Sequence, residues 1–157
     1  MTVTIIESEL RTALESIITD WPIRWPNEPW PPDLNLDLTN GNLPVNPDGS
    51  PMPCIEARVI HGLPITAIGG EGHRQARRSG LLKIYCIYPQ GIGMVDLTTH
   101  IDAIELGLGQ KTIMEELSQW QRLWTYPPRT DDNAAAIEAA NRFVRTVTVQ
   151  YQFSYRS

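Results

Sequence analysis

The sequence of 157 residues contains only two cysteines and three histidines, and this scarcity limits the metal sites that it can form. Cys54 and Cys86 cannot supply a four-cysteine zinc site or a disulfide framework. Neither a His-Glu-x-x-His nor a Cys-x-x-Cys spacing occurs. Both cysteines lie in apolar, strand-like stretches, where we expect small buried thiols. We therefore predict no metal ion and no cofactor.

The motifs of common catalytic centres are also missing. No Gly-x-Ser-x-Gly sequence supplies a nucleophile, and residues 107–112 lack the Gly-Lys-Ser/Thr order of a phosphate-binding loop. Asp96 and His100 share a helix face, with Glu105 nearby, which is compatible with weak metal binding but more typical of a solvated polar face. We predict no catalytic residues and no enzymatic activity.

Long apolar runs are absent, since no stretch approaches the ~20 apolar residues of a membrane-spanning helix. Residues 1–7 lack the basic start and continuous apolar region of a signal peptide. We expect a protein that is made in, and stays in, a reducing cytoplasm. Hydrophobic residues make up 41% of the chain, which is enough to form the core of a single domain over 1–157.

Basic residues are outnumbered by acidic ones, 13 to 18, so the net charge is −5. We therefore expect no free, extended nucleic-acid-binding surface. One basic cluster lies in the glycine-rich segment 61–80, where His73, Arg74, Arg77 and Arg78 occur within six residues. We interpret these four as contact residues for an acidic partner surface. A solvated hairpin tip and a nucleic-acid contact are the alternatives.

Hydrophobic periodicity predicts two helices and three clear strands. Thr4 and Glu7 form a capping-box pattern for a helix over 4–20, which Pro22 would end. A second helix is expected over 94–108. Strands are expected over 54–60, 81–88 and 143–155.

Three other segments, 33–53, 61–80 and 127–142, are predicted to be long loops. Residues 113–125 fit either a helical extension or a strand, and the alanine-rich stretch 131–141 fits a short exposed helix. The simplest packing of these elements is an α+β fold. It has a mixed, mainly antiparallel sheet with two helices packed on one face.

The final strand shows the clearest pattern, because mainly apolar or aromatic residues alternate with mainly polar ones over 143–155. This alternation indicates a half-buried antiparallel strand with a core face and a polar face. The even-numbered residues, from Val144 to Ser154, are predicted to form the polar face. The predicted core face carries Phe143, Arg145, Val147, Val149, Tyr151, Phe153 and Tyr155.

The segment 21–32 contains three tryptophans and five prolines. Proline lacks the backbone donor that regular elements need, so we predict an extended arm that lays aromatic rings on the domain. Packing of these rings on the protein's own core is the favoured interpretation. Packing on a neighbouring subunit is the alternative, and it makes Trp25 and Trp30 candidate contact residues.

The order of the segments provides a further indication of function. An N-terminal helix leads to the Trp-Pro segment 25–30, a strand over 55–59 and a glycine- and arginine-rich loop. A strand then runs through a Tyr-Pro pair into a glycine turn over 84–93, a helix containing 101–104 packs back, and an alternating strand closes the chain. This order, most specific over 77–104, resembles the tail terminator proteins of long-tailed bacteriophages and gene transfer agents, the group that includes the lambda-type tail terminator.

The resemblance implies a structural virion protein at the head–tail interface, assembled in the host cytoplasm. Members of this family form a hexameric ring on the head-proximal end of the tail tube, which stops tube polymerisation and joins the tail to the head. Its implied partners are further copies of the chain, the tail tube protein and a head–tail connector or stopper protein. Packaged DNA passes through the channel without specific binding. The long segments 33–53 and 127–142 depart from the family pattern.

Two other functions compete with this one. A head–tail connector or stopper, or a minor tail protein, is the first alternative, since all of these are small α+β ring-formers. A small-molecule-binding domain is the second, and it would need His61, His73 and Arg74 gathered around a cavity. For the ring, we expect subunit contacts from the polar face of 143–155 and from segment 61–80.

Overall fold

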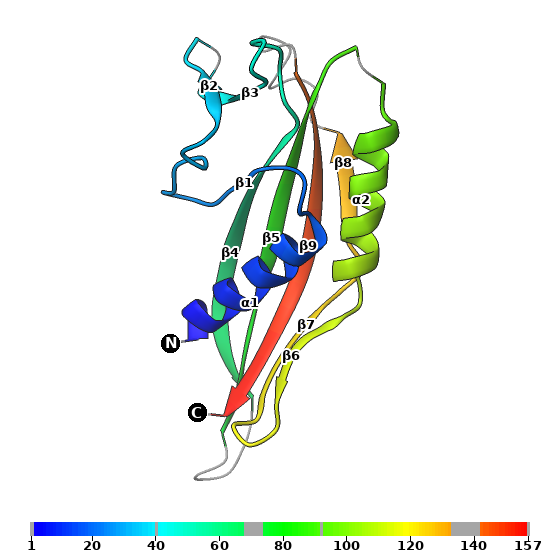
Figure 1. Ribbon diagram of the computed structural model, residues 1–157. Helices are drawn as coiled ribbons and strands as arrows, with labels where there is room; N and C mark the ends of the chain where they lie inside the picture. Colours follow the sequence, from blue (N-terminus) through cyan, green and yellow to red (C-terminus); the bar gives the residue numbers. More distant parts are fainter. Residues whose placement is uncertain (1, 40, 68–73, 92, 133–141, 157) are drawn as a thin grey trace.

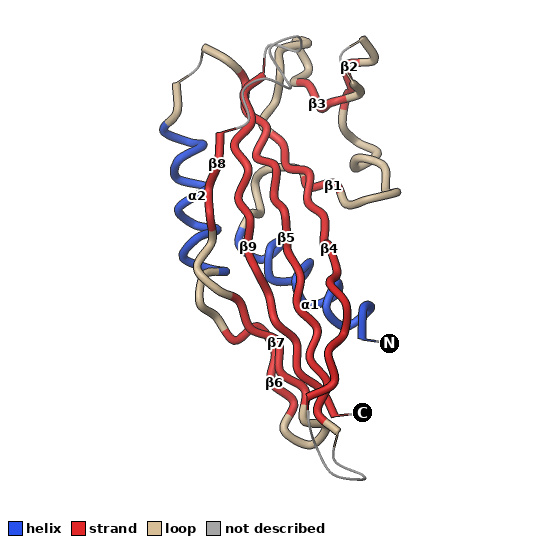
Figure 2. Tube along the Cα trace, turned by 180° about the vertical axis from the view of Figure 1, so that it is seen from behind, coloured by secondary structure: helices blue, strands red, loops and turns tan. Residues whose placement is uncertain are grey.

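The computed structural model describes residues 2–39, 41–67, 74–91, 93–132 and 142–156. It shows a long, twisted sheet with two helices on one face (Figures 1 and 2), which confirms the predicted α+β fold. The elements are α1 (Thr2–Ile17), β1 (Ile23–Arg24), β2 (Asn35–Asp37), β3 (Leu43–Val45), β4 (Cys54–Ala67), β5 (Gln75–Pro89), α2 (Val95–Leu108), β6 (Thr112–Glu116), β7 (Gln121–Thr125), β8 (Arg129–Asp132) and β9 (Arg142–Arg156).

The main sheet has the strand order β1-β4-β5-β9-β7-β6, and β8 also pairs with β9. The pairing of β1 with β4 is parallel, and the other pairings in this sheet are antiparallel. A small β2–β3 hairpin forms a separate sheet. The sheet is therefore mixed and mainly antiparallel, as predicted.

Strands β4 and β5 are much longer than the strands predicted over 54–60 and 81–88. Most of segment 61–80, predicted to be a loop, is strand, and the pairing of β5 with β9 continues to Gln75 and Arg156. Glycine and charged residues disfavour strands locally, but the unbroken alternation of β9 supplies a partner along the whole length of β5. Pairing with that partner outweighs local propensity.

The first helix differs from its prediction at both ends. It begins two residues before Thr4 and ends at Ile17, ahead of Pro22, so the predicted capping box is wrong. Glu7 instead contacts β4, where its Oε1 atom lies 2.9 Å from Nε2 of His61. The second helix, α2, matches its prediction closely. Within the described residues, neither helix is long and apolar enough to cross a membrane.

Short strands occur in other segments that were predicted to be irregular. The ambiguous segment 113–125 folds mainly as the β6–β7 hairpin, and 33–53 contains β2 and β3. Segment 127–142 contains β8, which takes the first two residues of the helix predicted over 131–141. The rest of that predicted helix, 133–141, lies outside the described residues. The Trp-Pro arm contributes β1, so it is not wholly irregular.

The main core lies between the helices and the sheet. Leu10 of α1, Ile104 of α2 and Val149 of β9 are completely buried in it. Burial of such side chains provides most of the free energy that favours folding. The odd-numbered face of β9 faces this core, which confirms the predicted face for Val147, Val149, Tyr151 and Phe153.

The opposite face of the sheet is polar over only part of its length. Val144 and Thr146, predicted to lie on the polar face, are 1% and 8% exposed. The Trp-Pro arm and segment 33–53, which contains the β2–β3 hairpin and is called the β2–β3 excursion below, fold over the end of the sheet that contains Val144. They bury this end. The second apolar cluster formed there contains Trp30, Cys54, Ile87 and Val144.

A buried arginine fastens the excursion to the sheet. The guanidinium of Arg142 donates to the carbonyl oxygens of Met52 at 2.9 Å and Pro44 at 2.5 Å. Burial lowers the pKa of Arg142 from its ordinary value, although such a group stays charged at neutral pH. Arg142 of β9 therefore holds the long segment 33–53 to the sheet through two of the segment's backbone carbonyls.

Candidate interaction surfaces

The β4–β5 hairpin carries the predicted basic residues, and it extends past both helices at one end of the sheet (Figures 1 and 2). Arg74 and Arg77 are exposed, whereas Arg78 is half-buried. Neighbouring strand residues point to opposite faces, and Arg78 is in register with Phe153 of the core. Arg77 therefore lies on the helix-free face and Arg78 on the helix-covered face. His73 lies outside the described residues.

Arg78 contributes to the interior more than to the surface. Burial raises the pKa of Tyr151 to about 12, and the charge of Arg78 acts in the opposite direction. The Nε atom of Arg78 is buried and has no hydrogen-bond partner within the described chain. The predicted basic cluster is thus divided, and Arg74 and Arg77 are the members placed to contact a partner.

Apolar side chains accompany these arginines. Leu63 and Ile65 of β4 are 85% and 68% exposed. The β6–β7 turn reaches the same end of the sheet in both views and exposes Leu117 and Trp120. Grouped exposure of apolar residues marks an interaction site more often than scattered exposure does. We call this surface the hairpin end, formed by Leu63, Ile65, Arg74, Arg77, Leu117 and Trp120.

Trp25 and Trp30 pack on their own domain, as the favoured interpretation predicted. Their exposed fractions are 7% and 4%. The indole Nε1 of Trp25 donates to Glu15 of α1 at 3.1 Å, and the guanidinium of Arg24 lies 4.8 Å from the centre of the Trp30 ring. These contacts leave little ring surface for a neighbouring subunit, so the structure does not support the two tryptophans as contact residues.

His61 joins Glu7 and Tyr151 in a hydrogen-bonded relay. Its Nδ1 atom lies 2.7 Å from the Tyr151 hydroxyl, and its Nε2 atom lies 2.9 Å from Glu7. A base between a hydroxyl and a carboxylate is the arrangement of nucleophilic catalysis. Here the hydroxyl is buried and its raised pKa keeps it protonated. The relay therefore fastens α1 to the sheet, and Arg74 lies away from it at the hairpin tip.

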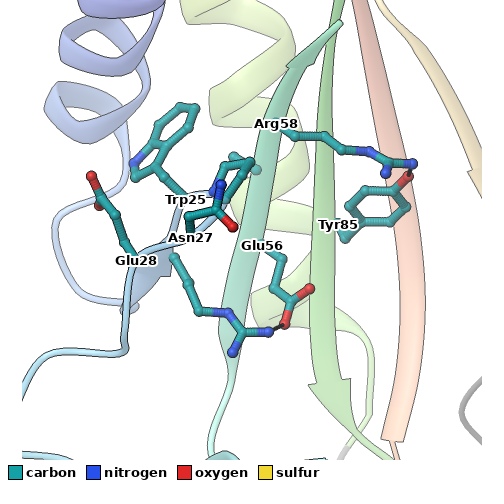
Figure 3. Close-up of a pocket in the computed structure, with 9 residues that line it drawn as sticks. Trp25, Asn27, Glu28, Glu56, Arg58 and Tyr85 are labelled. Atoms are coloured by element: carbon teal, nitrogen blue, oxygen red, sulfur yellow. Dashed lines mark hydrogen bonds and ion pairs between the residues drawn. The ribbon is translucent and has the colours of Figure 1, made fainter.

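A groove of about 490 Å³ lies between the Trp-Pro arm and β4 (Figure 3). Glu56 accepts a hydrogen bond from Arg24 across its floor. Arg58 donates to the hydroxyl of Tyr85 at 2.8 Å. Because these polar groups are directed at one another, the groove does not present the convergent free groups that a small-molecule site needs.

The cysteines and the Asp96–His100 pair are structural in character. Burial raises the pKa of Cys54 and Cys86 to about 12 each, which confirms the predicted buried thiols. His100 lies 2.8 Å from Asp20 through Nε2, and its Nδ1 meets the backbone of Asp96 rather than the carboxylate. In the described parts of the chain, no three His, Cys, Asp or Glu side chains come together to hold a metal ion.

The sequence reasoning missed the apolar part of the hairpin end. Leu63 and Ile65 are two residues apart, which is a strand spacing. The glycine-rich character of segment 61–80 favoured a loop instead. A strand predicted past residue 60 would have pointed to these two side chains.

Comparison with known proteins adds support for the fold. No protein-family model and no curated protein matches the chain. One of the solved structures that match, a protein whose name describes no function, has a TM-score of 0.54 and 15% sequence identity, and the match covers 94% of each chain. At this identity the likeness concerns the fold alone.

Proposed function

We propose that this protein is a structural subunit of a bacteriophage or gene-transfer particle. It caps the head-proximal end of the tail tube as a hexameric ring, stops tube polymerisation and joins the tail to the head connector. The order of elements supports this proposal. A helix, a Trp-Pro arm, a long hairpin, a second helix and an alternating final strand follow one another in the structure, in the order on which the resemblance to tail terminators rests.

The observation that carries the proposal is the hairpin end. Leu63 and Ile65 lie where their own chain does not cover them, next to exposed arginines. Apolar side chains with arginine at hand are typical of a protein interface. A cyclic ring uses two different surfaces of each subunit, one for each neighbour, and the projecting hairpin suits one of them.

The two ends of the molecule also differ, as a cap requires. A cap binds the last ring of the tube on one side and presents a side to which no further tube ring binds. The hairpin end is apolar and basic, whereas the opposite end carries the β2–β3 excursion (Figure 1) with the aspartates of segment 33–53. Such a subunit is suited to meet the tube with one end and the connector with the other.

Removing the gene from a particle-producing cell tests this function. Without a cap, tube polymerisation continues, so we expect tails of uncontrolled length without heads in negative-stain electron micrographs. Wild-type protein supplied in trans should restore normal tails. Tails of normal length that fail to join filled heads would assign the chain to the connectors or stoppers instead. Normal particles would overturn a virion role and reopen the small-molecule-binding alternative.

A further inference from the structure

The helix-free face of the sheet carries cations in two rows that run across its strands. The first row aligns Arg58 of β4, Lys83 of β5, Thr148 of β9 and Arg129 of β8. The second row aligns Ile65 of β4, Arg77 of β5, Ser154 of β9 and Arg122 of β7. Directly opposite residues point to the same face. The rows lie about 20 Å apart, since six residues of β5 separate them at ~3.3 Å each.

Hydroxyl and amide groups occupy part of the surface between the rows, beside the apolar side chains of Ile60, Leu81 and Trp124. Ser79 is in register with Gln152, and Gln150 lies two residues before Gln152 on β9. All three are at least partly exposed. This region therefore offers neutral hydrogen-bond donors between two lines of charge.

Few carboxylates offset these cations. Asp131 pairs with Arg129 at 3.1 Å, and Glu115 is in register with Arg122. Glu56, at the upper edge of the face, pairs with Arg24. The guanidinium of Arg58 lies along the sheet against Tyr85, as Figure 3 shows, rather than against a carboxylate. The helix-free face is therefore positively charged, although the whole chain is acidic.

The helix layer on the other side has the opposite charge. Helix α1 contains three glutamates and one arginine, and α2 contains Asp96, Asp102 and Glu105 with no lysine or arginine. The charge of the chain is thus unevenly distributed, with an acidic helix layer and a basic sheet face. The potential that a partner meets depends on the face that it approaches.

We propose that the helix-free face binds the phosphate backbone of nucleic acid, without reading its sequence. Arginine, lysine, serine, threonine and glutamine side chains are the groups that contact phosphates in protein–nucleic acid complexes. Both rows and the surface between them consist mainly of these residues. An extended, slightly twisted surface also allows a polymer to cross several strands at once.

The same face suits nucleic acid better than a second protein. The centre of a protein interface is depleted in charge and enriched in aromatic and apolar side chains. Here five cations lie in the two rows, and the partly exposed Ile60, Leu81 and Trp124 lie between them. The density of positive charge, rather than an absence of apolar side chains, therefore favours nucleic acid. The acidic helix layer of a second copy is the competing occupant, and the experiment below separates the two.

This inference deepens the proposed function, and the choice of double-stranded DNA as the ligand rests on it. In a ring through which DNA passes, a backbone-binding face would contact the passing duplex at every subunit. Such contacts are independent of sequence, so they do not prevent the DNA from sliding.

Salt-dependent binding of a fluorescein-labelled DNA duplex of about 20 base pairs, followed by anisotropy, tests the inference. Contacts from Arg58, Lys83, Arg77 and Arg122 to four phosphates predict a slope of log K against log salt of about −3.6. Affinity should then fall about 150-fold between ~50 and ~200 mM salt. The variants R58Q/K83Q and R77Q/R122Q should each reduce the slope by about 1.8.

The matched control is R11Q/K111Q, which removes the same charge from outside the face and should leave the slope unchanged. An equal loss of slope in this control would show a general charge effect and overturn the inference. So would absence of binding at ~50 mM salt. Salt-dependent self-association in sedimentation, abolished by R58Q/K83Q, would assign the face to a second copy instead. A protein that binds the duplex but whose deletion leaves tails normal would keep this inference and overturn only the tail-terminator role.

Discussion

The two faces of the sheet are built from the same strands, yet the helix-covered face is buried and much of the helix-free face is exposed to solvent. Val149 and Gln150 are neighbours on β9, and one is fully buried while the other is exposed. The helix-covered face stabilises the domain through apolar packing. Outside the second apolar cluster around Trp30 and Val144, the helix-free face contributes little to stability. Its exposed residues there are available for contacts with partners. Most of the apolar packing that stabilises the domain therefore lies on one side of the sheet.

The largest expected effect comes from a charge placed on the covered face. Val149→Asp buries an unpaired carboxylate between the helices and the sheet, which should cost more than about 4 kcal/mol and prevent folding. Gln150→Asp, the matched change on the free face, should cost less than about 1 kcal/mol. Circular dichroism and thermal unfolding measure both. A folded Val149→Asp protein would show that the faces are wrongly assigned.

A smaller but still large effect is expected at Gly80 of β5. A Cβ atom there would collide with the carbonyl oxygen of Ile60 and the hydroxyl of Tyr151. We expect Gly80→Ala to cost about 3 kcal/mol, as overpacking does in a tight core. Ser79→Ala, the neighbouring change on the free face, should cost less than about 0.5 kcal/mol. Urea unfolding of both variants checks this, and equal midpoints would contradict the tight packing at Gly80.

The covered face should also make stability sensitive to alkali. Burial raises the pKa of Tyr151 to about 12, so the folded state holds this proton more tightly than the unfolded chain, whose tyrosines titrate near pH 10. The stability is fully present below about pH 10 and is lost as pH rises towards 12, by about 2.5 kcal/mol.

The variant Tyr151→Phe separates this contribution from other alkaline effects. It should cost about 1 kcal/mol at neutral pH through loss of the hydrogen bond to His61. It should then lose less stability than the wild type above about pH 10, so that the two stability curves converge and then cross as the pH approaches 12. If urea unfolding showed the free energies of the two proteins falling in parallel across this pH range, the raised pKa of Tyr151 would not be the cause of the loss.

The smallest effect on stability is expected at the hairpin end. Replacing Arg74 and Arg77 by alanine should change the unfolding free energy by less than about 0.5 kcal/mol, since both side chains are exposed. Particle yield should nevertheless fall, because the contact with a partner is weakened. Leu63→Ser and Ile65→Ser should act in the same direction. Normal particle yield from these stable variants would rule out the hairpin end as a contact surface.

Sequence reasoning was most successful where the pattern and the tertiary packing agree. The alternation over 143–155 predicted β9 and its core face, because a half-buried strand requires that period. It was least successful over 61–80, where Gly62, Pro64 and Gly80 have low strand propensity. That segment is a strand because β9 lies beside it, and a partner distant in sequence leaves no local signal.

The candidate surfaces show the same division. The arginines of the hairpin were visible as a cluster, but adjacent residues in a strand point apart, so Arg77 and Arg78 separate. The net charge of −5 argued against a nucleic-acid surface, because a sum over the chain cannot show that cations and carboxylates are unevenly divided between the two faces. Trp30 was predicted to pack on its own core, but its position over Val144 depends on the fold of the whole arm.

Cryo-electron microscopy of the particle that carries this protein would locate the proposed ring directly. We expect a six-fold ring of this chain at the head-proximal end of the tail tube, with the hairpin end of each subunit in contact with a neighbouring chain. A twelve-fold ring against the portal, or absence of the chain from the particle, would contradict it.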